Sequence, residues 1–156
     1  MDLRELLASH HANVFAFLYR LCGDPHLAED LMQETFVRAL RASGRYEARG
    51  KVSTWLFSIA ANLAKDHWRQ QKRHAEVPLD EGTLSVRPDE EGVEVREALL
   101  RLPLEQRTVL ILRYYHDLSY AEIADALVIP LGTVRSRIHN GLERMKSELL
   151  EGVGAR

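Results

Sequence analysis

The sequence has one cysteine, Cys22, in 156 residues. A single thiol excludes an internal disulfide framework and any zinc site built on several cysteines. No apolar run approaches the roughly 18 residues that are needed to span a bilayer. The N-terminus also lacks the basic start and apolar core of a signal peptide. We therefore expect a cytoplasmic protein.

The sequence also lacks the motifs of common enzyme sites. It contains no HExxH motif, no His-x-His with carboxylates and no glycine-rich phosphate loop. The adjacent His10 and His11 point in different helical directions, which makes them a poor metal site. We predict no catalytic residue, no metal, no cofactor and no small-molecule substrate.

Strand-like alternation and internal repeats are absent, whereas apolar residues recur every three or four positions throughout the sequence. This period is typical of amphipathic helices. The predicted helices span 2–21, 25–42, 53–73, 93–102, 104–115 and 120–127, and a last one starts at 131. Asp24-Pro25 supplies an N-cap and a first helical residue, and Ser53 or Thr54 is expected to cap the helix that follows. We predict that Leu40 lies on the buried side of the helix 25–42. The expected fold is all-α, with two small helical domains.

Charge is distributed unevenly, although the net charge is only −2. Residues 38–73 carry nine basic and two acidic side chains, whereas residues 74–105 carry three basic and nine acidic ones. Residues 74–92 contain prolines, glycines and acids without a sustained period, which is typical of a flexible linker. Because charges act over about 10 Å at 0.1 M salt, the local patches matter more than the sum. The pattern suits two nucleic-acid contacts joined by an acidic linker.

The segment 119–149 predicts a helix-turn-helix. Ser119 and Glu122 form a capping box, and Pro130 prevents the first helix from continuing. The second helix has one apolar stripe, made of Val134, Ile138, Leu142, Met145 and Leu149. Its other sides carry Thr133, Arg135, Ser136, Arg137, His139 and Asn140. A helix held by one side, with polar and guanidinium groups on the others, suits the DNA major groove. The alternative is an ordinary amphipathic helix hairpin.

The helix 53–73 carries a second candidate surface for DNA. A polar stripe with three cations and no acid runs along it through Thr54, Ser58, Asn62, Lys65, Arg69 and Lys72. The loop before it presents Arg45, Tyr46, Arg49 and Lys51. Basic groups contact phosphates whatever the base sequence, and a nearby aromatic ring can stack on an unpaired base. The combination favours single-stranded or opened DNA, although a basic helix side is more often simply solvated.

Three blocks of the sequence resemble the extracytoplasmic-function (ECF) group of bacterial sigma factors. These blocks are AEDLMQETFVRAL (28–40), STWLFSIAANLAKDHWRQQKR (53–73) and LPLEQRTVLILRYYHDLSYAEIADALVIPLGTVRSRI (102–138). The third is the most specific, especially LSYAEIA followed by P-x-GTVRSR. The resemblance implies a sigma region 2 domain at 1–73, a linker at 74–92 and a sigma region 4 helix-turn-helix domain at 93–152.

The resemblance also implies partners and site residues. Core RNA polymerase is bound through the clamp helices of its largest subunit and through its flap. The clamp helices are expected to contact Asp30, Gln33 and Glu34. We expect the opened −10 promoter element to contact Arg45, Tyr46, Lys51, Ser58, Asn62, Lys65 and Arg69. The −35 duplex is expected to contact Thr133, Arg135, Ser136, Arg137, His139 and Asn140. An anti-sigma factor is a further implied partner.

Two positions depart from the family pattern. Val128 stands where the family usually has glycine, and valine is disfavoured if that turn needs a positive φ angle. Asn140-Gly141 replaces a common arginine pair, and a glycine within a helix costs about 1 kcal/mol relative to alanine.

Two other functions compete with the sigma-factor hypothesis. A free-standing helix-turn-helix transcriptional regulator would explain the segment 119–149, but it leaves the basic helix 53–73 without a role. A metal-dependent hydrolase that uses His10, His11, His67 or His74 is disfavoured because the motifs of such enzymes are missing.

Overall fold

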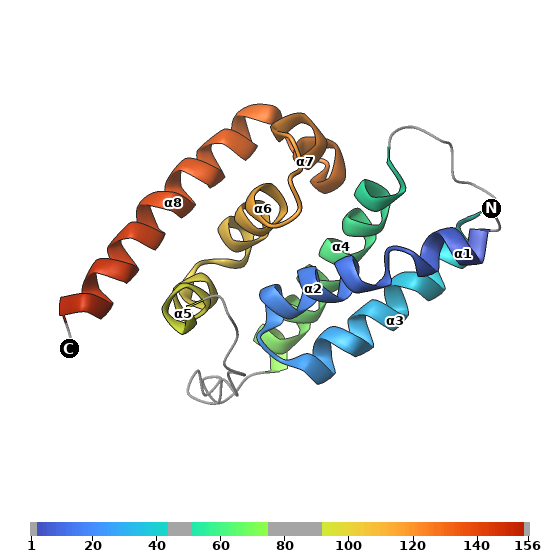
Figure 1. The fold of residues 1–156 in the computed structure, drawn as a ribbon, viewed down its shortest axis with the longest axis horizontal. Helices are drawn as coiled ribbons and strands as arrows, with labels where there is room; N and C mark the ends of the chain where they lie inside the picture. Colours follow the sequence, from blue (N-terminus) through green and yellow to red (C-terminus); the bar gives the residue numbers. More distant parts are fainter. Residues whose placement is uncertain (1–2, 44–50, 75–91, 155–156) are drawn as a thin grey trace. The chain divides into compact units, whose positions relative to one another are not determined.

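The computed structural model describes residues 3–43, 51–74 and 92–154. Within these ranges every regular element is an α-helix, and none of the helices is long and apolar enough to span a membrane. The chain divides into two compact units, Met1–Leu84 and Ser85–Arg156 (Figure 1). The prediction of an all-α fold with two small helical domains is confirmed. The predicted linker falls almost entirely on residues 75–91, which lie outside the described residues.

The first unit is built on three helices that pack against one another in pairs, preceded by a short one. These are α1 (Leu3–Ala8), α2 (His11–Cys22), α3 (Pro25–Arg41) and α4 (Val52–His74). The packing of α2, α3 and α4 buries Phe17 and Phe57, whose ring centroids lie 5.3 Å apart in an edge-to-face arrangement. Such aromatic pairs stabilise a core beyond their buried area.

The prediction of one helix from 2 to 21 was wrong, because the chain turns between α1 and α2. The Ser9 hydroxyl donates to the carbonyl of Leu6 at 2.6 Å, and the His10 N–H donates to the carbonyl of Leu7 at 3.0 Å. Hydrogen bonds over three residues tighten the helix end, and a serine hydroxyl competes for the backbone carbonyl. The apolar period continues through this turn and therefore conceals it.

The start of α3 confirms the prediction made from Asp24 and Pro25. The Asp24 carboxylate accepts a hydrogen bond from the His26 N–H at 2.9 Å, and Pro25 is the first helical residue. Before it, Gly23 closes α2 in the left-handed conformation, with φ at 73°. The start of α4 differs from prediction. This helix begins at Val52, so its expected caps, Ser53 and Thr54, lie inside the first turn.

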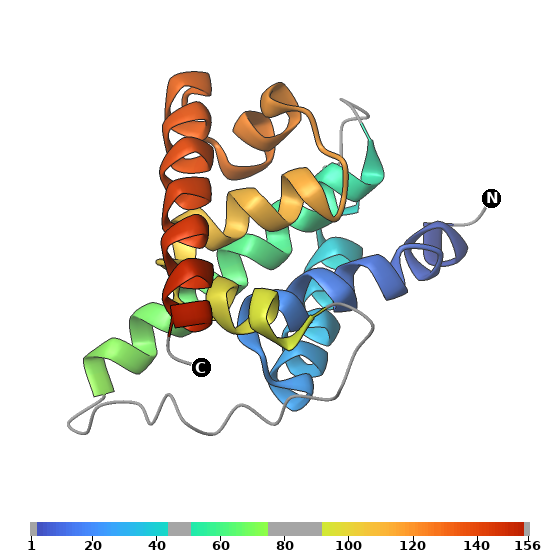
Figure 2. The same ribbon diagram turned by 60° about the vertical axis from the view of Figure 1, so that its left-hand side comes forward.

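The second unit contains α5 (Val93–Arg101), α6 (Leu104–Tyr114), α7 (Tyr120–Leu127) and α8 (Leu131–Gly154). Helix α8 packs against each of the other three (Figure 2). At the junction of α5 and α6, the buried Arg107 donates to the carbonyls of Leu100 at 3.0 Å and Leu102 at 2.9 Å. A cation at a helix C-terminus satisfies carbonyls that have no partner within the helix. Arg107 therefore joins α6 to the end of α5.

The helix-turn-helix consists of α7, the turn 128–130 and the first turns of α8. The predicted capping box is present, since the Ser119 side chain accepts from the Glu122 N–H at 3.1 Å and the Glu122 carboxylate accepts from the Ser119 N–H at 3.0 Å. Val128 ends α7 in the left-handed conformation, with φ 54° and ψ 53°, and its side chain is 83% exposed. The turn thus requires a positive φ at a β-branched residue.

The apolar stripe of α8 is only partly as predicted. Val134 and Ile138 are buried, but Leu142 is exposed and the buried side continues through Gly141 instead. A Cβ atom at position 141 would lie 3.1 Å from Cδ1 of Leu110 in α6. Glycine therefore allows α6 and α8 to approach closely, which explains a residue that the sequence pattern marked only as a cost to the helix.

Candidate nucleic-acid interface

One side of α4 is polar, basic and open to solvent. Asn62, Lys65 and Arg69 are exposed, and Ser58 is half-buried. Their spacing places them on the side of the helix opposite to the buried Leu56. Lys51, just before the helix, is exposed as well, whereas the predicted Arg45 and Tyr46 lie outside the described residues. Lys51, Lys65 and Arg69 supply three cations, and Asn62 and Ser58 supply an amide and a hydroxyl, so together they can bind phosphates and hydrogen-bond to bases.

The first turns of α8 hold the second set of candidate residues. Four of the six predicted side chains are exposed, namely Arg135, Ser136, His139 and Asn140. Thr133 is half-buried, and its carbonyl accepts a hydrogen bond from the Ser136 hydroxyl at 3.0 Å. The buried Val134 and Ile138 fix the opposite side of the helix on the unit's core. This arrangement presents the polar residues as the recognition helix of a helix-turn-helix does.

Arg137 is placed differently from the other candidates on α8. It lies at the boundary between the exposed polar side and α6, where its guanidinium is 3.8 Å from the Glu105 carboxylate. The Arg137 side chain is 27% exposed and that of Glu105 is 67% exposed. Its guanidinium therefore already has a charged partner within the unit, which it would have to leave to contact DNA.

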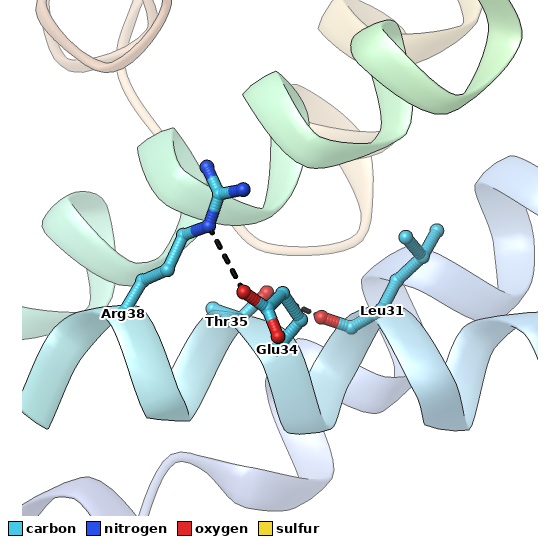
Figure 3. A network of polar contacts seen from close by, with 4 residues as sticks. All are labelled: Leu31, Glu34, Thr35 and Arg38. Atoms are coloured by element: carbon cyan, nitrogen blue, oxygen red, sulfur yellow. Dashed lines mark hydrogen bonds and ion pairs between the residues drawn. The ribbon is translucent and has the colours of Figure 1, made fainter. Parts of the chain in front are cut away.

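The outer side of α3 carries the three predicted polymerase contacts. Asp30 and Gln33 are exposed, and Glu34 is half-buried and forms an ion pair with Arg38 at 3.2 Å (Figure 3). On the inner side of the same helix, the Thr35 hydroxyl donates to the Leu31 carbonyl at 2.7 Å. The helix therefore separates an outer side with charges from an inner side that belongs to the core.

Sequence reasoning missed two apolar residues on this outer side. Val37 is 39% exposed and Leu40 is 42% exposed, so the prediction that Leu40 is buried was wrong. Val37 follows Gln33 and Asp30 by four and seven positions, and Leu40 follows Val37 by three, so all four share one side of α3. The same spacing in the sequence could have identified them, because Val37 and Leu40 lie opposite the buried Ala28 and Ala39.

In the part of the chain that the structure describes, no group of three or more histidine, cysteine, aspartate or glutamate side chains is placed so that it could hold an ion. The polar surfaces of α3, α4 and α8 are instead open and helical, and they suit macromolecular partners.

Comparison with protein families divides the sequence at the same places as the fold. Sigma-70 region 2 matches residues 6–74, and Sigma-70 region 4 matches residues 92–145. The first match therefore contains α2, α3 and α4, and the second contains α5, α6, α7 and most of α8.

Individual proteins resemble the chain along nearly its whole length. The ECF RNA polymerase sigma factor SigW of Bacillus subtilis (strain 168) is 36% identical to it, over 93% of this chain and 87% of SigW. The RNA polymerase sigma factor CarQ of Myxococcus xanthus is 34% identical, over 94% of this chain and 88% of CarQ. Among solved structures, the sigma factor RpoE of Bartonella quintana, crystallised with the anti-sigma factor NepR, matches with a TM-score of 0.78 and 27% identity. That match covers 96% of this chain and 97% of RpoE.

Proposed function

The chain belongs to the ECF group of the sigma-70 family, and we propose that its exposed helix faces on α3, α4 and α8 are the surfaces that contact polymerase, the −10 element and the −35 element. As an alternative sigma factor, it directs core RNA polymerase to specific promoters. The observation that carries the proposal is the presence, on one chain, of a helix-turn-helix and a separate helix with an exposed basic stripe.

Helix α4 and the segment before it contact the opened −10 element. Lys51, Lys65 and Arg69 supply positive charge for the DNA backbone, and Asn62 and Ser58 supply groups that hydrogen-bond to a base. Arg45 and Tyr46, outside the described residues, complete this set, with the Tyr46 ring available for stacking. The region 2 domain extends over 1–73.

Helix α8 contacts the −35 duplex in its major groove. Ser136 and Asn140 lie near the centre of the exposed side, with Arg135 and His139 on one flank and Thr133 and Arg137 on the other. The domain that holds them extends over 93–152, and residues 74–92 link it to the first.

Helix α3 contacts core polymerase. Asp30, Gln33 and Glu34 supply polar groups for the clamp helices of the largest subunit, while Val37 and Leu40 add apolar surface in the same row. Apolar side chains beside charged ones are typical of the buried core and polar rim of a protein interface. The second domain contacts the flap.

An anti-sigma factor is the further partner that we propose. RpoE of Bartonella quintana was crystallised with one, and its chain resembles this one over nearly the full length of both. We place the protein in the cytoplasm, where polymerase and promoter DNA are found.

Transcription with purified core polymerase on genomic DNA fragments tests the function as a whole. Sequencing of the transcript 5′ ends should reveal start sites that depend on the chain and share two upstream elements. If the chain neither binds core polymerase nor creates such start sites, the proposal is wrong.

Single substitutions test the two DNA surfaces at the promoters found in this way. Asn62→Ala should reduce permanganate reactivity of −10 thymines while polymerase binding is kept, whereas Asn13→Ala, at an exposed position of α2, should leave both unchanged.

On α8, Ser136→Ala should weaken the dependence on the −35 sequence. Ser147→Ala, which is also exposed but lies near the other end of α8, should have no effect. If Asn62→Ala behaves like Asn13→Ala, the −10 assignment of α4 is refuted. If Ser136→Ala behaves like Ser147→Ala, the −35 assignment of α8 is refuted.

A further inference from the structure

The ion pair between Glu105 and Arg137 places an anion beside the recognition helix. The two side chains come from positions 32 residues apart in the sequence, and their charged groups are 3.8 Å apart. Arg137 is one of two arginines within the first two turns of α8, so the pair involves half of the guanidinium groups available there.

The position of Glu105 in α6 favours a negative charge. Glu105 lies in the first turn of this helix, where the N-terminal end of the helix dipole stabilises a negative charge. Its side chain is mostly exposed, so the carboxylate stays in contact with solvent whether or not Arg137 contacts it. It places a negative charge at the edge of the DNA-facing side of α8.

A negative charge at this position repels the phosphates of an approaching duplex. Any duplex that approaches α8 without the matching bases gains from Arg137 only after the ion pair is broken, and its backbone meets a like charge at the same time. A duplex with the matching −35 sequence meets the same cost, but the base contacts that it makes with the other side chains of α8 outweigh it. The carboxylate therefore lowers the affinity for every duplex, and a duplex without the matching bases has no contacts that compensate for the loss.

We propose that Glu105 is an affinity-limiting residue, which holds Arg137 in an ion pair when no DNA is bound and lowers the affinity of the second domain for DNA of arbitrary sequence. The inference rests on the proposed role of α8 in −35 recognition and adds a residue outside the helix-turn-helix to it. Because the ion pair must break before Arg137 can bind a phosphate, part of the contribution of Glu105 depends on Arg137.

Binding of the full chain to a fluorescein-labelled duplex of mixed sequence, two helical turns long, tests this proposal. Fluorescence anisotropy is measured over a series of KCl concentrations below physiological ionic strength. Glu105→Gln should raise the affinity roughly twofold to fivefold, the range expected for an exposed ion pair. The plot of log affinity against log salt should become steeper by about 0.9, as for one additional phosphate contact.

Glu148→Gln is the matched control. It removes the same charge from the same domain and breaks an ion pair of similar length, with Arg101 at 3.6 Å, near the other end of α8. This variant should change the affinity less and leave the salt slope as it is. In an Arg137→Ala background, Glu105→Gln should raise the affinity less than it does in the original chain, because only the direct repulsion of phosphates is then relieved.

Three results would overturn the inference: equal effects of Glu105→Gln and Glu148→Gln, a lower affinity of Glu105→Gln, or no binding by either Glu105→Gln or the original chain. None of these would refute the proposed function, which is judged by start sites and −35 dependence in transcription with core polymerase.

Discussion

Replacing Val128 with glycine should stabilise the second domain. Val128 adopts φ 54°, a conformation that costs an ordinary L-residue roughly 1–2 kcal/mol and is worse for a β-branched one. Glycine removes this strain, but it also makes the unfolded chain more flexible, which lowers the free energy of unfolding by about 0.4–1 kcal/mol. Little apolar burial is lost, because the valine side chain is already exposed. The expected net gain is about 1 kcal/mol, which corresponds to a rise in melting temperature of about 4–8 °C for a domain of this size.

The measurement must distinguish the two domains. Both tryptophans, Trp55 and Trp68, belong to α4, so tryptophan fluorescence reports on the first domain alone. Far-UV circular dichroism reports on all helices, and hydrogen exchange of peptides from α6 and α8 isolates the second domain. In Val128→Gly the exchange protection of these peptides should increase, while the fluorescence transition stays where it is.

Val128→Ala separates the backbone strain from the effect of branching. Alanine keeps a Cβ atom, so it should recover less than half of the gain that glycine gives. An equal gain with alanine, or a loss of stability with glycine, would show that the left-handed backbone at this turn is not the source of the strain.

Three further substitutions test other parts of the structure. Arg107→Met leaves the carbonyls of Leu100 and Leu102 without their charged donor, and it should lower the free energy of unfolding of the second domain by about 1.5–3 kcal/mol in urea titrations. An unchanged midpoint would contradict this. Gly141→Val should cost about 1–3 kcal/mol by overpacking against Leu110. Gly141→Ala should leave the free energy of unfolding nearly unchanged, since a helix-propensity gain of about 1 kcal/mol offsets the tight contact. Similar losses of stability in Gly141→Val and Gly141→Ala would contradict this. Val37→Glu should weaken binding to core polymerase at least about fivefold, as expected for a contact worth more than 1 kcal/mol, with an unchanged melting temperature. Val93→Glu, at an equally exposed valine in α5, is its control, and equal weakening by both would refute the α3 assignment.

Local sequence signals predicted those features whose causes are local. The Ser119–Glu122 capping box and the Asp24-Pro25 helix start each depend on residues at most three positions apart, and both are present in the structure. The exposed polar side of α4 followed from the helical period alone. For Val128, the usual glycine of the family raised the question of a positive φ without answering it, and the structure shows φ 54° there.

Features that depend on packing between distant segments were missed or mistaken. Periodicity assigned Leu142 to the core, but α6 approaches α8 at Gly141 and leaves Leu142 exposed. The ion pair joins Arg137 to Glu105, which is remote in the sequence, so no local pattern predicts it. The turn at Ser9 and His10 depends on competing hydrogen bonds that hydrophobic spacing does not register.

The length of α8 has a mechanical consequence. The helix runs without interruption for 24 residues, or about 36 Å. Its first turns carry the proposed −35 recognition residues, and Glu148, near its other end, forms an ion pair with Arg101 of α5. Because α8 also packs against α6 and α7, its two ends move together with the whole second domain. An inhibitor that binds the α5 end would therefore displace the proposed recognition residues from DNA without covering them, which leaves these residues free to diverge with their promoters.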